Sequence, residues 1–306
     1  MTVTPGPLQA ICFALVIAGL SADTLPRWDL LPAPPPMPAP ERSGFAPVND
    51  ISMYYAIYGQ GTPLLLIPGG LSSSDVWAAV IPLLDKQHEV VVADSRGQGR
   101  STQTDARLTY SLMASDYLAL LDYLRLPRVA VVGWSDGAII GFDLAIHHPD
   151  RLTALFAQAG NASPEGLVVP SPRPYGVFSA LKERILAVAR AFKRRTLAFL
   201  GAPSTTRAPS IALQNEIHEL WATEPHYSES ELASIRVRTA IAIGDHDDVI
   251  RRDHTEYLAR TIPGAQLIVL RDVGHPAVLQ DPAGYARAVL DFVDASTPSR
   301  PAAARQ

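Results

Sequence analysis

The stretch around Ser135 has the residue types and the spacing for nucleophilic chemistry. Ser135 is the centre of a Gly-Trp-Ser-Asp-Gly pattern at 133–137. The apolar, mostly β-branched residues 129–132 predict a strand buried on both faces, and 138–146 predict a helix that ends before Pro149. A sharp strand-to-helix turn of this kind, a nucleophile elbow, holds the serine Oγ clear of the sheet. Because a serine hydroxyl is a weak nucleophile at neutral pH, Ser135 also needs a base within hydrogen-bond reach.

The composition excludes several classes of protein. A chain of 306 residues, 47% of them hydrophobic, can bury a sizeable core. The net charge of −4 gives no indication of binding to nucleic acid or to another polyanion. The single cysteine, Cys12, cannot form a disulfide framework or a cysteine-rich zinc site within one chain.

The first 43 residues are expected to precede the folded unit. Residues 8–20 are apolar apart from Gln9, and small residues follow them, so 1–22 are predicted to be a signal peptide although no Lys or Arg precedes the apolar run. The run is too short to predict a stable membrane span in the mature protein. Residues 23–43 are rich in proline and predict an extended linker. We therefore expect an exported protein, periplasmic or secreted, or a cytoplasmic one if the apolar segment is no signal.

From residue 44 onward the sequence alternates between strand and helix patterns. The aromatic-rich stretch 51–58 predicts an antiparallel edge strand. Buried strands are predicted at 64–67, 88–93, 129–132, 152–159, 239–243 and 267–270, and helices at 76–87, 111–124, 138–146 and 282–293. This alternation is typical of an α/β fold in which helices cover both faces of a mostly parallel sheet.

Three motifs resemble those of the α/β-hydrolase fold superfamily, in its branch of bacterial serine esterases, lactonases and meta-cleavage hydrolases. They are Leu-Ile-Pro-Gly-Gly at 66–70, Asp-Ser-Arg-Gly-Gln-Gly-Arg-Ser at 94–101 and Gly-Trp-Ser-Asp-Gly at 133–137. In the second motif we expect Arg96 to brace a turn. The resemblance implies a hydrolase core at 44–160 and 236–296, with a helical cap inserted after the sixth strand at 161–235. A flexible tail is expected at 297–306.

The resemblance also implies an acid and a histidine after two late strands. His275 lies in a Gly-His-Pro turn after the last predicted strand and is the candidate base. An aspartate-rich turn follows the strand 239–243, and the family pattern Gly-x-x-Asp selects Asp247 in it, with Asp245 as the alternative. In such a triad the aspartate orients the histidine, which takes the proton from Ser135.

The oxyanion hole that the family implies consists of two backbone N–H groups. One belongs to Asp136, the residue after the nucleophile. The other belongs to Gly70, or alternatively to Leu71, in a loop where Pro68 stands in place of the usual histidine. We expect the side chain of Asp136 to point away from this hole, because only its backbone has a role there.

The cap is expected to contain two helices, 178–200 and 211–222. The first is rich in Lys and Arg, and we interpret these charges as a solvated helix face. Trp221 in the second helix is a candidate apolar wall of the substrate pocket, together with Trp134 and Leu71.

No cofactor or metal ion is expected. The Asp-His-Asp-Asp run at 245–248 lacks the second group of ligands that would make a metal site. A serine at position 135 also argues against haloalkane dehalogenase and epoxide hydrolase chemistry, which needs a carboxylate nucleophile. Other histidines, His88 and His254 among them, lie in polar contexts where we expect them to be solvated.

The sequence therefore predicts a hydrolase that cleaves a small-molecule carboxylic ester or lactone through an acyl-enzyme intermediate. Three alternatives stay open. They are carbon–carbon bond hydrolysis with the same triad, perhydrolase activity, and non-catalytic binding of a small molecule on the same fold. Neither the natural substrate nor the oligomeric state follows from the sequence.

Overall fold

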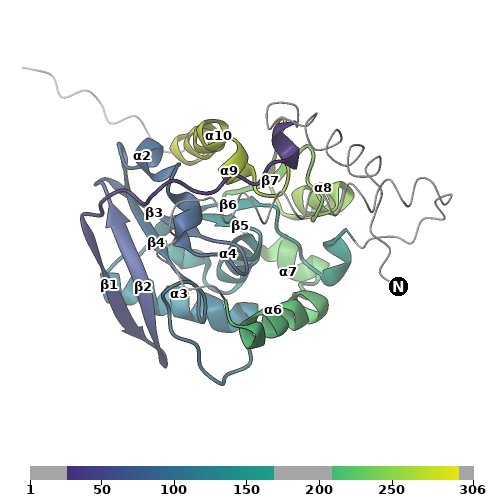
Figure 1. The fold of residues 1–306 in the computed structure, drawn as a ribbon. Helices are drawn as coiled ribbons and strands as arrows, with labels where there is room; N and C mark the ends of the chain where they lie inside the picture. Colours follow the sequence, from purple (N-terminus) through teal and green to yellow (C-terminus); the bar gives the residue numbers. More distant parts are fainter. Residues whose placement is uncertain (1–25, 169–208, 296–306) are drawn as a thin grey trace, which may run out of the picture.

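The computed structural model describes residues 26–168 and 209–295 (Figure 1). Among these residues, no helix combines the length and the apolar character that crossing a membrane requires. The predicted signal peptide at 1–22, the basic cap helix at 178–200 and the tail at 297–306 lie outside the described residues.

An eight-stranded sheet forms the centre of the fold, with the strand order β1-β2-β4-β3-β5-β6-β7-β8. The strands are β1 (Arg42–Val48), β2 (Ile51–Tyr58), β3 (Thr62–Ile67), β4 (His88–Ala93), β5 (Val129–Trp134), β6 (Leu152–Gln158), β7 (Thr239–Gly244) and β8 (Gln266–Leu270). β2 is antiparallel to both of its neighbours, and every pair from β4 to β8 is parallel. The predicted mostly parallel sheet is confirmed, but β1 rather than β2 takes the edge.

The described helices cover the sheet on both faces. They are α2 (Ile81–Leu84), α3 (Tyr110–Leu124), α4 (Asp136–His147), α6 (Ile211–Thr223), α7 (Glu229–Ser234), α8 (Arg252–Thr261), α9 (Ala277–Gln280) and α10 (Pro282–Asp294). The helix predicted at 76–87 is instead a 3-10 turn, η3 (Ser74–Trp77), followed by the short helix α2. Pro82 explains the break, because a proline has no N–H to donate inside a helix but fits its first turn.

Successive residues of the buried strands pack on opposite faces of the sheet. On β3, Leu65 and Ile67 belong to an apolar cluster that includes residues of α3, α4 and α8. Leu64 and Leu66 belong to a second cluster, with residues of α2 and α10. In Figure 1, α2 and α10 accordingly lie above the sheet and α3 below it. These two layers explain why the central strands are apolar throughout.

Residues 26–41, which we expected to be part of an extended linker, lie against the core. Apart from one 3-10 turn they form no helix or strand, as their prolines predict. However, the Trp28 ring stacks on the His246 ring at a centroid distance of 3.7 Å, and Met37 packs against the apolar cluster around α10. The described fold therefore begins well before residue 44.

Arg96 braces the loop after β4, as expected. Its Nε and Nη2 donate hydrogen bonds of 2.8 and 2.7 Å to the carboxylate of Asp116 on α3. Its Nη1 donates one of 2.7 Å to Asp50, between β1 and β2. The side chains of Arg96 and Asp116 are each 1% exposed, so the pair is a buried, bidentate ion pair.

Replacing Arg96 by leucine should therefore destabilise the fold. The variant leaves Asp116 buried without its cation, which costs roughly 3–5 kcal/mol of unfolding free energy. Urea unfolding followed by circular dichroism measures the change. Arg107→Leu is the matched control, because that side chain is 67% exposed and its loss should change stability by less than about 0.5 kcal/mol. Similar small losses in both variants would contradict the bracing role.

Candidate active site

Ser135 stands at the junction of β5 and α4 in a strained backbone conformation, with φ 55° and ψ −120°. A Cβ atom on Gly133 would lie 2.2 Å from the carbonyl oxygen of Gly137. A Cβ atom on Gly137 would lie 2.1 Å from the carbonyl oxygen of Ile67 at the end of β3. Both glycines of the motif are therefore required by the close packing of three backbone segments around the serine.

Hydrogen bonds connect Ser135, His275 and Asp247 in a row. The Nε2 atom of His275 lies 3.0 Å from Ser135 Oγ, and its Nδ1 atom lies 3.1 Å from Asp247 Oδ2. Ser135 follows β5, Asp247 follows β7 and His275 follows β8. The parallel order of these strands brings the three loops to the same edge of the sheet, so three positions far apart in the chain meet there.

The carboxylate of Asp247 is also held by backbone N–H groups of its own loop. Its Oδ1 accepts hydrogen bonds of 2.9 Å from the backbone N–H groups of Val249 and Ile250. The alternative acid, Asp245, has a different contact, since its Oδ1 accepts a 3.3 Å hydrogen bond from the N–H of Val273. The geometry favours Asp247 over Asp245 as the partner of His275.

A cavity of about 400 Å³ includes Ser135 and His275 in its lining. Its apolar wall consists of Trp134, Leu167, Val168, Trp221, Val249 and Ile250. Two of the three predicted pocket residues, Trp134 and Trp221, thus border the cavity. Leu71 does not line it. This residue has a positive φ of 56°, and its side chain packs into a small apolar cluster with Leu108, Leu213 and Ile217.

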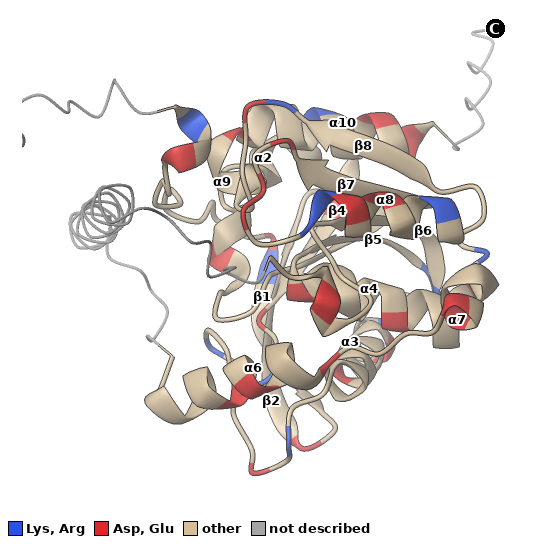
Figure 2. Cartoon of the chain, turned by 90° about the vertical axis from the view of Figure 1, so that its right-hand side faces the viewer, with Lys and Arg blue, Asp and Glu red and all other residues tan. Residues whose placement is uncertain are grey.

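The charged side chains of this lining are acidic. Asp136, Glu224 and Asp248 border the cavity, and no Lys or Arg does so among the described residues. Helix α6, which carries Trp221, has two glutamates and no Lys or Arg along its length (Figure 2). The described part of the site therefore has an acidic surround.

The side chain of Asp136 does not point away from the site, so that expectation was wrong. It is 3% exposed and borders the cavity, where its Oδ1 accepts hydrogen bonds from Trp221 Nε1 at 2.9 Å and Tyr110 Oη at 3.2 Å. Burial raises the pKa of Asp136 to about 6, and the hydrogen bonds from Trp221 and Tyr110 oppose this rise only in part. The two donors hold the carboxyl in place beside the nucleophile.

The two predicted oxyanion donors, Asp136 and Gly70, border the same cavity. Asp136 is the first residue of α4, so its N–H has no acceptor within the helix. A Cβ atom on Gly70 would lie 2.2 Å from Asp136 Oδ2 and 2.9 Å from Trp221 Cζ2. Only glycine fits at position 70, because the Asp136 carboxyl and the Trp221 ring pass directly over it.

Some polar side chains have positions that the sequence did not predict. Tyr110 and Glu224 border the cavity, and neither belongs to a motif that could have singled it out.

The expectation that His88 is solvated was wrong, because it is buried with Nδ1 2.7 Å from Thr62 Oγ1. His254 is only half-buried, and its Nε2 accepts a hydrogen bond from the N–H of Ala162.

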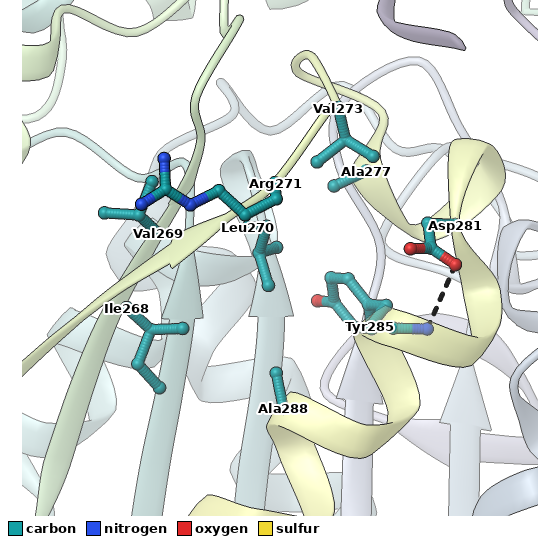
Figure 3. A pocket seen from close by; sticks show the side chains of 10 residues that line it. Ile268, Val269, Leu270, Arg271, Val273, Ala277, Asp281, Tyr285 and Ala288 are labelled. Carbon is teal, nitrogen blue, oxygen red and sulfur yellow. Dashed lines mark hydrogen bonds between the residues drawn. The ribbon is translucent and has the colours of Figure 1, made fainter.

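A second cavity, of about 250 Å³, lies between β8 and α10 (Figure 3). Ile268, Leu270 and Ala288 provide part of its apolar lining. The buried hydroxyl of Tyr285, another lining residue, has no hydrogen-bond partner among the described residues. None of the predicted site residues borders this cavity, so it is separate from the candidate active site.

Comparisons with known proteins identify the family. The model of the alpha/beta hydrolase fold family matches residues 62–213. The rhodomycin D methylesterase DauP of Streptomyces sp. (strain C5) is 30% identical over 266 residues, which cover 72% of this chain and 87% of DauP. This chain is an α/β hydrolase.

Two further similarities extend over most of the hydrolase. A protein of Pseudomonas savastanoi pv. phaseolicola (strain 1448A / Race 6), named as a carbamate hydrolase (RutD), is 28% identical over 253 residues, or 77% of this chain and 95% of the relative. The solved structure of Est816, described as an N-acyl homoserine lactone degrading enzyme, superimposes with a TM-score of 0.63 at 26% identity. That match covers 80% of this chain and 98% of Est816. These relatives are named as a methylesterase, a carbamate hydrolase and a lactone-degrading enzyme.

The buried Asp136 predicts a pH-dependent stability of this hydrolase. The pKa of Asp136 in the folded protein, about 6, lies above its ordinary value of 3.8. Between these pH values the folded protein binds more protons than the unfolded chain does, so the free energy of unfolding falls as the pH rises from about 4 to about 6. A rise of this size corresponds to about 3 kcal/mol. In urea titrations, wild type should lose up to this amount relative to Asp136→Asn between pH 4 and 7. Parallel pH profiles of the two proteins would contradict a raised pKa.

Proposed function

We propose that this α/β hydrolase cleaves a carboxylic ester or lactone, with Ser135, His275 and Asp247 as its catalytic triad. The observation that carries the proposal is the hydrogen-bonded row from Asp247 through His275 to Ser135 Oγ, with distances of 3.1 and 3.0 Å. This is the geometry that a base needs in order to activate a serine hydroxyl.

In this mechanism Ser135 Oγ attacks the carbonyl carbon while His275 Nε2 takes the hydroxyl proton. Asp247 stabilises the imidazolium that forms, without itself being protonated. The backbone N–H groups of Asp136 and Gly70 donate to the developing oxyanion. His275 then returns the proton to the leaving alcohol, and water hydrolyses the acyl-enzyme by the same steps.

Removal of any triad side chain should abolish turnover while the fold is kept. With p-nitrophenyl acetate, wild type should release a stoichiometric burst of p-nitrophenol followed by steady turnover. Ser135→Ala and His275→Ala should lose both, and Asp247→Asn should lower kcat by roughly 10⁴-fold, as comparable triads do. Asp245→Asn is the matched control for the acid and should keep kcat within a few-fold. A near-wild-type rate in Asp247→Asn would refute the assignment of the acid.

The acidic side chains around the cavity support a substrate that carries no negative charge. Asp136, Glu224 and Asp248 face the same space as Ser135, with no Lys or Arg in the described lining. A carboxylate on the substrate would be repelled there, because like charges at short range in a partly desolvated site cost on the order of a kcal/mol or more. The names of two relatives agree, since they refer to a methyl ester and to a lactone, in which the scissile group carries no charge.

A matched pair of esters tests this electrostatic preference. p-Nitrophenyl pentanoate and mono-p-nitrophenyl glutarate have similar acyl lengths, but only the second carries a carboxylate. We expect kcat/KM to be at least about tenfold lower for the glutarate, which corresponds to about 1.4 kcal/mol. In the double variant Glu224→Gln/Asp248→Asn the ratio should shrink while the rate on the pentanoate ester stays the same. Equal rates on both esters in wild type would contradict the preference.

The three alternatives differ from ester hydrolysis in measurable ways. Carbon–carbon bond hydrolysis and perhydrolase activity both use a serine triad and would keep the dependence on Ser135 with other substrates. A binding protein would show no burst with any ester while remaining folded. The burst experiment therefore separates the binding protein from the enzymes, and substrate comparison separates the enzymes from each other.

A further inference from the structure

The segment just before the core contacts both loops that carry the proposed acid and base. Its 3-10 turn η2 (Arg27–Asp29) places the Trp28 ring flat on His246, with an interplanar angle of 10°. His246 directly precedes Asp247 in the loop after β7. In the same 3-10 turn, Arg27 Nη1 forms an ion pair of 2.8 Å with Asp281, the residue before α10.

Gln280, the last residue of α9, joins this segment to the turn of the proposed base. Its Oε1 accepts a hydrogen bond of 2.6 Å from the N–H of Gly274, the residue before His275. Its Nε2 donates to the carbonyl oxygens of Trp28 at 3.0 Å and Leu30 at 2.7 Å. Gln280 is buried, and its one amide group satisfies three backbone partners at once.

Gly274 lies where several segments meet. A Cβ atom at this position would lie 3.2 Å from the carbonyl oxygen of Trp28 and 3.3 Å from that of His246. The N–H of His246 also donates a 3.0 Å hydrogen bond to the carbonyl oxygen of Val273. The turn that carries His275 is therefore enclosed by the loop after β7, by Gln280 and by the N-terminal segment.

We propose that residues Arg27–Leu30 form a strap, and that Gln280 is a positioning residue which couples this strap to His275. The proposal rests on the role of His275 in the proposed function. His275 lies in a loop rather than in a helix or strand, so its position relative to Ser135 depends on the contacts of that loop. Displacement of a proton-transfer group by about 1 Å costs up to roughly 10²-fold in rate.

Other contacts also hold the His275 loop, so removal of the strap should weaken catalysis without abolishing it. The carbonyl oxygen of His275 accepts hydrogen bonds from Trp134 Nε1 at 2.9 Å and from Gln158 Nε2 at 3.3 Å. The strap and Gln280 act on the preceding residue instead. The expected loss therefore appears in kcat, while substrate binding in the cavity is unchanged.

The test uses full-length Gln280→Leu, which is similar in size but cannot form the three hydrogen bonds, and Trp28→Ala, which removes the stacking contact. Leu31→Ala is the matched control in the same segment, because Leu31 is exposed. With p-nitrophenyl acetate we expect kcat to fall about 10- to 100-fold in Gln280→Leu and by a smaller factor in Trp28→Ala. KM should stay within about twofold, and Leu31→Ala should match wild type.

Amide hydrogen exchange provides a readout that is independent of turnover. In both strap variants, exchange at 273–276 should become faster while β5 and α4 keep their protection, and Leu31→Ala should show no change. The proposal is overturned if Gln280→Leu keeps both the wild-type kcat and the wild-type exchange. If Gln280→Leu does not fold, the same result in Trp28→Ala overturns it. If wild type itself neither turns over esters nor reacts with a fluorophosphonate at Ser135, the proposed function fails instead.

Discussion

The close approach of three backbone segments at Ser135 is the constraint on which the site depends. The end of β3, the end of β5 and the first turn of α4 pack so closely that positions 133 and 137 have no room for a Cβ atom. Ser135 has a positive φ within this packing, and α4 begins directly after it, so the N–H of Asp136 has no helical acceptor, as at the start of any helix. The tight strand-to-helix turn thus presents the Ser135 hydroxyl to the cavity beside the first N–H of α4.

The remaining parts of the site are held by contacts with distant segments. The acid is fixed by backbone N–H groups of its own loop, and the base turn is enclosed by α9 and by residues that precede the first strand. Trp221 reaches the nucleophile turn from α6 by a hydrogen bond to Asp136. The candidate site therefore depends on segments from Trp28 to Gln280 that are far apart in the chain, although its reacting atoms occupy a few loops.

Sequence reasoning succeeded where a local pattern has a single structural solution. The apolar runs of β3 to β8 and the glycines around Ser135 belong to this class, and they led to the fold and to the position of Ser135. His275 and Asp247 followed from the family resemblance, with Asp245 left as an alternative acid. Sequence reasoning failed where the partner comes from elsewhere in the chain. The burial of Asp136 depends on Trp221 and Tyr110, and the docking of the proline-rich segment depends on His246 and Gln280. No local pattern around Asp136 or Trp28 reveals these partners.

The crowding above Gly70 links three positions that are remote in the chain. The carboxyl of Asp136 and the ring of Trp221 both lie within 3.0 Å of where a Cβ atom at position 70 would be, so a larger residue there requires both side chains to be displaced or reduced in size. A larger residue at position 70 would create a steric clash, and the loss of the Trp221 indole would remove a hydrogen bond from the buried carboxyl of Asp136. The choice of residue at one of these positions therefore limits the choice at the other two, which couples the nucleophile turn to α6.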